Sequence, residues 1–208
     1  MSVICNKLHY MFVSKNRHYF PFNESEIPQN GIYVLFEKGE MGHGTERIVR
    51  IGTHTGEGRL LSRIKEHFLK ENKDRSIFRK NIGRAILSKS NDIFLEQWNW
   101  DLTTREKKNK LLPLLDTKKQ VQIEKEVTKY IQDNFSFVVF EVPSKYDRLD
   151  LESKIISTVS LCQDCEVSTS WLGNSSPVSK IQQSGLWLVQ GLYKTPLNME
   201  DLSKIKVT

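Results

Sequence analysis

The run FSFVVFEV at residues 135–142 constrains the fold of this chain more than any other part of its sequence. Aromatic and β-branched side chains favour extended backbone, and a strand that is apolar at almost every position has to be buried on both faces. The pattern predicts a central strand in the interior of a sheet.

A β-hairpin is predicted well before this strand. Residues 32–36 (IYVLF) form a second β-rich run, and residues 47–51 (RIVRI) read as the strand that returns. The glycines between the two runs supply a flexible connection, which we expect to be a rather long loop. Together the three runs indicate a small antiparallel or mixed sheet.

Four segments are predicted to form helices that flank this sheet. In the first, residues 59–71, Leu60, Ile64 and Phe68 recur at helical spacing and give one apolar stripe. The other three cover residues 76–89, 119–133 and 145–162. This order of strands and helices predicts an α+β fold in a single domain over residues 1–208.

We expect the core of the domain to cover about residues 31–176. Three segments, one of them inside this range, do not follow its pattern of strands and helices. Residues 1–30 read as an irregular or partly stranded N-terminal arm, because prolines and a turn signal interrupt them. Residues 90–118 are polar and weakly patterned, so we interpret them as an insertion with a short helix. The C-terminal extension, residues 177–208, contains a predicted strand at 185–192.

The composition is that of a soluble protein with excess positive charge. Lys and Arg number 31 against 25 Asp and Glu, a net charge of +6, and each basic side chain can neutralise a nucleic-acid phosphate. The chain lacks a long apolar run, a signal peptide and a complete set of disulfide-forming cysteines. These features predict a cytoplasmic protein with no membrane partner.

Several other residues receive ordinary structural interpretations. Cys162 and Cys165 form one C-x-x-C, but no second pair completes a zinc site, so we expect two plain thiols at a helix end. His43 and His54 are expected to be solvated loop residues. The tryptophans are expected to pack in the core or at an interface: Trp98, Trp100, Trp171 and Trp187.

Basic residues gather on the first predicted helix and after it. On the helix they share one face opposite the apolar stripe, where like charges repel and a bound polyanion would relieve the repulsion. A solvated basic face is the alternative. The candidate phosphate-binding residues on and around this surface are Arg50, Arg59, Lys70, Arg79, Lys80 and Arg84.

One carboxylate falls on an apolar helix face. Glu152 precedes Ile155, Ile156 and Val159 by three, four and seven residues, so it shares their side of the helix. A buried carboxylate is costly unless it is paired or binds a metal. Either a salt bridge to a lysine or a divalent cation with water and phosphate ligands would satisfy it.

An ordered set of motifs connects these residues. It resembles the GIY-YIG nuclease superfamily over about residues 31–176, with an unusually long middle. The matching elements are Gly31-Ile32-Tyr33 on the first strand, Ile51-Gly52 on the second, Leu60-x-x-Arg63-x-x-x-His67 on the first helix and Glu152 on a later helix.

The resemblance implies a role for each matched residue. Tyr33 would activate the attacking water, and Arg63 would contact the scissile phosphate and stabilise its developing charge. His67 would transfer a proton or orient the tyrosine, and Glu152 would hold one Mg²⁺, for which Mn²⁺ may substitute. Asn174 is the loosest match, to a polar residue that several members place near the metal.

The second motif departs from the family pattern. It reads Arg50-Ile51-Gly52, so a guanidinium stands where the family has a tyrosine hydroxyl. Arg50 could bind a phosphate or act on Tyr33 through its charge, and it could also mean weakened chemistry.

The sequence therefore predicts a metal-dependent endonuclease acting on double-stranded DNA, of a restriction or defence type, with a homodimer needed to cut both strands. A repair or mobile-element nuclease targeted by a partner is one alternative. A catalytically weakened nucleic-acid-binding module is another, and a basic protein with accidental motif matches is the third.

Overall fold

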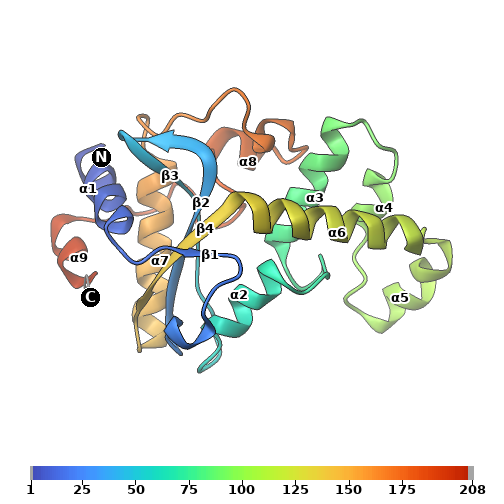
Figure 1. The fold of residues 1–208 in the computed structure, drawn as a ribbon, viewed down its shortest axis with the longest axis horizontal. Helices are drawn as coiled ribbons and strands as arrows, with labels where there is room; N and C mark the ends of the chain where they lie inside the picture. The colour runs from blue at the N-terminus through green and yellow to red at the C-terminus, as the bar shows by residue number, and fades with distance from the viewer. Residues whose placement is uncertain (1, 206–208) are drawn as a thin grey trace.

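Strands β2 (Gly31–Gly42) and β4 (Phe135–Glu141) form the middle of a four-stranded antiparallel sheet in the computed structural model, which describes residues 2–205. The short strand β1 (His18–Tyr19) flanks β4, and β3 (Thr45–Gly52) flanks β2, so the order is β1-β4-β2-β3 (Figure 1). The predicted α+β fold and the interior position of residues 135–141 are confirmed.

Nine α-helices surround the sheet within residues 2–205, and none of them is long and apolar enough to cross a membrane. They are α1 (Ser2–Val13), α2 (Leu60–Phe68), α3 (Ile77–Lys89), α4 (Leu95–Asn99), α5 (Arg105–Leu111), α6 (Thr117–Asn134), α7 (Lys145–Ser160), α8 (Ser179–Ser184) and α9 (Met199–Lys204). Short 3₁₀ turns cover Glu24–Glu26, Leu112–Leu114 and Leu172–Ser175.

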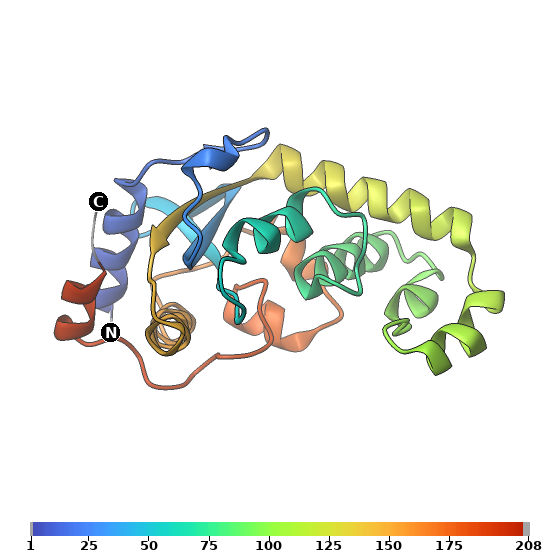
Figure 2. The same cartoon turned by 90° about the horizontal axis from the view of Figure 1, so that it is seen from below.

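Alternating side chains of β2 divide the core into two layers. Tyr33 and Leu35 face a cluster that α2, α3 and α6 complete, whereas Ile32, Val34 and Phe36 face a cluster completed by α1, α7 and α9. Figures 1 and 2 show α1, α7 and α9 at one end of the molecule and the long α6 leading to α4 and α5 at the other. The alternation explains why strands that are apolar at every position are needed here.

The hairpin connection is shorter than predicted. The expected long loop is wrong, because residues 37–42 continue β2 and only His43 and Gly44 form the turn. Both turn residues have positive φ values, 53° and 73°, as a tight hairpin turn requires. A β-bulge near Val49 shifts the register, so that Leu35 pairs with Arg50 and Phe36 with Ile48.

The N-terminal arm is partly stranded as predicted, with β1 at His18–Tyr19, but its beginning is not irregular. Its first part is the helix α1, and Cys5, Leu8 and Phe12 lie at helical spacing on its buried side. The prolines and the turn signal that led to the prediction all lie after α1, so they do not prevent this helix.

The predicted strand at residues 185–192 is also wrong. Trp187 donates one backbone hydrogen bond to Val49 of β3 at 2.8 Å, but the described backbone forms no strand there. The carbonyls of Gly185 and Trp187 accept hydrogen bonds from the guanidinium groups of Arg47 and Arg50 instead. The guanidinium groups of Arg47 and Arg50 on β3 therefore donate to these two carbonyls, as the backbone N–H groups of a paired strand would.

The insertion folds back on α3. It contains two short helices, α4 and α5, rather than one. Trp98 of α4 lies so close to Gly83 that a Cβ there would be 2.3 Å from the indole, and its Nε1 donates to the Lys80 carbonyl at 2.9 Å. Trp98, Trp171 and Trp187 are buried as predicted, and Trp100 is partly buried against the same core.

A buried carboxylate joins four parts of the chain. Glu37 of β2 is only 3% exposed, and it accepts hydrogen bonds from Nε1 of Trp171 and Nε1 of Trp187, both at 2.8 Å, and from the hydroxyl of Tyr130 on α6. Burial raises the pKa of Glu37, while the three donors oppose this shift. The contact fixes the C-terminal segment and α6 to the sheet.

We predict that Glu37→Ala lowers the free energy of unfolding by on the order of 3–5 kcal/mol, because three buried donors lose their acceptor at about 1–3 kcal/mol each. Glu37→Gln should lose less, since one carbonyl oxygen remains. Urea unfolding monitored by tryptophan fluorescence measures both. The exposed Glu141→Ala on β4 is the control and should change stability by less than about 0.5 kcal/mol. Equal stability of Glu37→Ala and Glu141→Ala would contradict this account.

Candidate active site

The two motif glycines are explained by close approach of other groups. Gly52 pairs with Tyr33 across the hairpin, and a Cβ at Gly52 would lie 2.2 Å from the tyrosine hydroxyl oxygen. A Cβ at Gly31 would lie 2.2 Å from the Phe140 carbonyl oxygen of β4. Side chains at these positions would move the ring of Tyr33 or separate the two central strands.

Tyr33 begins a chain of hydrogen-bonding side chains. Its hydroxyl lies 2.8 Å from Nε2 of His67 on α2, and Nδ1 of His67 lies 2.8 Å from the Ser76 hydroxyl. Ser76 also accepts the backbone N–H of Arg79, as the N-cap of α3. The ring of His67 is held at both nitrogens, and it in turn holds the phenolic oxygen.

His67 does not lie on an exposed basic face with Arg59 and Lys70, although helical spacing predicted that it shares their side of the helix. Its side chain is fully buried, because the helix directs it toward Tyr33, and Lys70 lies beyond the end of α2. Burial lowers the pKa of His67 well below its usual value, and the positive charges of Arg50, Arg63 and Arg79 lower it further. His67 is therefore a neutral imidazole near pH 7.

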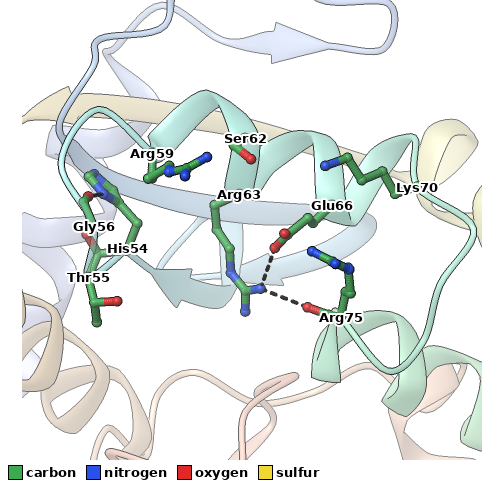
Figure 3. A pocket seen from close by; sticks show the side chains of 10 residues that line it. His54, Thr55, Gly56, Arg59, Ser62, Arg63, Glu66, Lys70 and Arg75 are labelled. Atoms are coloured by element: carbon green, nitrogen blue, oxygen red, sulfur yellow. Dashed lines mark hydrogen bonds and ion pairs between the residues drawn. The ribbon is translucent and has the colours of Figure 1, made fainter. Parts of the chain in front are cut away.

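Arg63 lies between the buried tyrosine and the surface. Its Nη1 donates to the Glu66 carboxylate at 2.9 Å and to the backbone carbonyl of Arg75 at 3.0 Å (Figure 3). Burial opposes its charge, but Tyr33 and Glu66 more than compensate, and the pKa of Arg63 is raised. A permanent positive charge thus stands beside the Tyr33 oxygen.

Glu152 reaches the same place from α7. Its Oε1 accepts the backbone N–H of Thr53 at 3.0 Å, just past the end of β3. Burial raises the pKa of Glu152, and Arg50, the Thr53 N–H and Arg63 oppose the shift. No lysine forms a salt bridge with Glu152 among the side chains that the structure describes. Its carboxylate oxygens, the kind of ligand that a hard divalent cation prefers, are therefore available to bind a metal.

Tyr33, Arg63 and Glu152 line one cavity of about 420 Å³, together with Arg50. The C-terminal segment around residues 188–194, here called the tail, closes the cavity. Its contribution could not be predicted from the sequence, because the segment contains no recognisable local motif. The tail residues that line it are Leu188, Val189, Gln190, Gly191 and Lys194.

Asn174 is not among the residues that line this cavity. It is exposed, and its side-chain amide donates to the carbonyls of Ser168 and Thr169. This placement gives Asn174 a local role in the turn around residues 172–175, whereas the resemblance implied a position near the metal.

Arg50 occupies the position of the missing second-motif tyrosine on the same face of the sheet as Tyr33. Its pairing with Leu35 directs the side chain there, and its guanidinium lies 5.1 Å from the centre of the Phe78 ring. It donates to the Trp187 carbonyl, but its Nε is buried without a hydrogen-bond partner. The charge acts on both His67 and Glu152.

A second hollow, of about 630 Å³, continues from the cavity along α2. Thr53 and Arg63 line both spaces, and the basic side chains of Arg59, Lys70 and Arg75 line the outer one (Figure 3). The loop that carries His54 forms its far end. His54 is buried, contrary to expectation, and its Nε2 accepts the N–H of Gly31 at 3.3 Å.

The remaining predicted phosphate-binding residues lie elsewhere and have protein partners. Arg79 is fully buried, and it forms an ion pair with Glu124 at 2.8 Å, so it cannot track a phosphate at the surface. Lys80 donates to the Trp100 carbonyl, and Arg84 donates to Asn99 at 2.7 Å. These contacts hold the insertion on α3.

We predict that the stability of the protein falls as the pH drops below about 6.5, in part because His67 must become charged in the unfolded state. A lowered pKa in the folded state gives stability that is complete above the unfolded pKa of 6.5 and is lost as the pH falls, by roughly 1.4 kcal/mol per unit at most. Urea unfolding at pH 7.5 and 5.5 should show a smaller loss for His67→Gln. His18 and His54, whose pKa values burial also lowers, should keep part of the slope. An identical slope in His67→Gln would contradict the buried neutral state.

Comparison with known proteins supports the arrangement. A model of the GIY-YIG domain matches residues 13–205, which is most of the chain. No curated protein and no solved structure matched it. The match includes the motif-bearing residues from Gly31 to Glu152 and extends beyond them to the C-terminal segment that completes the cavity. The chain therefore belongs to the GIY-YIG domain family, a family of nucleases.

Proposed function

We propose that this protein is a metal-dependent endonuclease that hydrolyses phosphodiester bonds of double-stranded DNA. The observation that carries the proposal is the convergence of Tyr33, Arg63 and Glu152 on one cavity, with His67 hydrogen-bonded to Tyr33 behind it. A base, a cation and a carboxylate within one site are what hydrolysis of a phosphodiester requires.

Tyr33 accepts the proton of the attacking water as a phenolate, after its own proton has gone to solvent, and the step returns it to the hydroxyl form. Neutral His67 holds the phenolic oxygen through a 2.8 Å hydrogen bond, and the charge of Arg63 beside it stabilises the phenolate. Arg63 also neutralises the charge that develops on the phosphoryl oxygens as the bond to the leaving oxygen breaks. Its contacts with Glu66 and the Arg75 carbonyl keep the guanidinium in one orientation.

Glu152 would hold one Mg²⁺, and Mn²⁺ would substitute for it. The fit rests on a half-buried carboxylate that lines the cavity, with one oxygen accepting the Thr53 N–H and no cationic side chain paired with it among the side chains that the structure describes. When bound, the cation supplies electrostatic stabilisation of the transition state and of the leaving oxygen. A single acidic ligand argues for one metal ion.

The outer hollow along α2 is the proposed path of the DNA backbone. Arg59, Lys70 and Arg75 offer positive charge beside the cavity, and phosphate contacts of this kind give affinity and register rather than sequence choice. Sequence choice would come from other surfaces, such as the insertion with α4 and α5. A homodimer would provide the second site needed to cut both strands.

Arg50 keeps a different function open, a nucleic-acid-binding module with weakened chemistry. Its buried Nε has no partner, and its charge lies near His67 and Glu152. The same charge can bind a phosphate, so the substitution need not abolish cleavage.

The biological role we favour is restriction or defence, and the alternative is repair or mobility with a partner that supplies targeting.

We predict that Glu152→Ala loses plasmid cleavage in Mg²⁺ by at least 100-fold but binds DNA with unchanged affinity, because the carboxylate serves the metal. Asp150→Ala is the matched control. Asp150 lies two residues before Glu152 on α7, on a different side of the helix, and its carboxylate pairs with Lys154 at the surface. Cleavage is followed on agarose gels and binding by fluorescence anisotropy. Equal DNA affinity with no cleavage by the wild type would favour the binding-module alternative.

We predict that Arg59→Ala and Lys70→Ala each weaken DNA binding and reduce the salt dependence of affinity by about one counterion, because each removes one phosphate contact. Lys129→Ala, an equally exposed lysine on α6 that pairs with Asp133, should leave both quantities unchanged. Binding titrations over a series of salt concentrations give the slope. If the slope responds equally to Lys129→Ala, the DNA path does not follow α2.

A further inference from the structure

We propose that the protein contains a structural zinc site formed by Cys5, His9, His43 and Cys165, separate from the catalytic centre. One ligand atom of each residue lies within 4.8 Å of the ligand atoms of the other three. Three segments far apart in the sequence contribute: α1, the β2–β3 turn and the loop after α7. In Figure 1 these segments lie together at the N-terminal end of the molecule.

The chemistry of the cluster selects zinc. Two thiols and two imidazoles are a donor set that zinc binds tetrahedrally in structural sites, with zinc–sulfur bonds of about 2.3 Å and zinc–nitrogen bonds of about 2.0 Å. Such a site places its ligand atoms roughly 3.3–3.8 Å apart. The sulfurs of Cys5 and Cys165 are 3.5 Å apart, and Nε2 of His9 is 3.8 Å from the Cys165 sulfur. Small side-chain movements would bring the four ligand atoms to the distances of a tetrahedral zinc site.

The helix α1 presents its two ligands on one face. Cys5 and His9 are separated by four residues, and both are fully buried. Nδ1 of His9 is 2.9 Å from the Cys5 carbonyl, so its N–H can donate there while Nε2 binds the metal. Nε2 also accepts the backbone N–H of Ile48 at 3.2 Å, a hydrogen bond that the metal would replace.

The hairpin turn brings in the third ligand. His43 occupies the first central position of the turn in a left-handed conformation, and its ring lies 4.9 Å from that of His9. Asparagine or glycine is the usual residue there, so the imidazole is not required by the turn itself.

The last ligand follows α7. Cys162 and Cys165 are both present in this loop, and the Cys162 sulfur lies 3.3 Å from Nε2 of His43 at the edge of the cluster. Cys162 also lies near Cys5, but Cys165 is the cysteine whose sulfur contacts both Cys5 and His9 and is grouped with all three other ligand atoms. Zinc binds both sulfurs as thiolates, so protons that the thiols carry are released to solvent, and the ion joins α1 to the loop that follows the helix carrying Glu152.

The test uses the full chain purified with reductant, with metal content measured by plasma mass spectrometry and zinc affinity by competition with a chelating dye. We expect about one zinc per chain, and a cobalt-substituted protein should show the visible absorption of tetrahedral cobalt and a thiolate charge-transfer band. His43→Asn, which keeps the turn conformation accessible, and Cys165→Ser should each lower zinc affinity at least 10-fold and lower the melting temperature of the zinc-loaded protein.

Two variants serve as controls. Cys162→Ser changes the neighbouring thiol and should bind zinc within about twofold of wild type, and Glu152→Ala should keep its zinc although it loses cleavage. Wild-type protein that neither contains zinc nor takes it up would overturn the proposal. A Cys5–Cys165 disulfide in the intact mass, or equal zinc loss in Cys162→Ser and Cys165→Ser, would also overturn the assigned site.

Discussion

The acceptance of three hydrogen bonds by the Glu37 carboxylate is the interaction on which the completed site depends. Two of its donors, Trp171 and Trp187, belong to segments that have little regular structure of their own. Once Trp187 is fixed, its carbonyl accepts a hydrogen bond from Arg50, and the residues after it close the cavity. A buried carboxylate is costly without partners, and each of the three donors reduces the cost of burying Glu37.

The electrostatics of the site follow from the same burial. Burial lowers the pKa of His67 and keeps its imidazole neutral, and the charges of Arg50, Arg63 and Arg79 add to this effect. Arg79 has its own buried carboxylate partner in Glu124, while Arg63 faces the cavity and Arg50 keeps an unpaired Nε. Positive charge is therefore concentrated where a phosphodiester would enter, with Glu152 as the nearby acidic counterpart.

Helix α7 links the two proposed metal sites. Its middle turn carries Glu152, and the loop after its last residue carries Cys165. The two sites use different donor atoms, oxygen for the catalytic cation and sulfur with nitrogen for zinc, so each would take a different metal. An anchor at the end of the helix would limit the movement of the carboxylate relative to Tyr33.

The sequence alone determined the elements with strong periodicity and the residues with fixed motif spacing. The strand at 135–141 and the helices near 60, 77, 117 and 145 could be read from local pattern, and the motif positions of Tyr33, Arg63, His67 and Glu152 from the resemblance to the family. Tertiary structure decided the rest, since a residue's partner is not encoded locally. It buried Arg79 against Glu124, moved Asn174 away from the cavity and brought the tail to it without a strand. It also gathered Cys5, His9, His43 and Cys165 from separations that no local motif could reveal, because long-range packing brings those segments together.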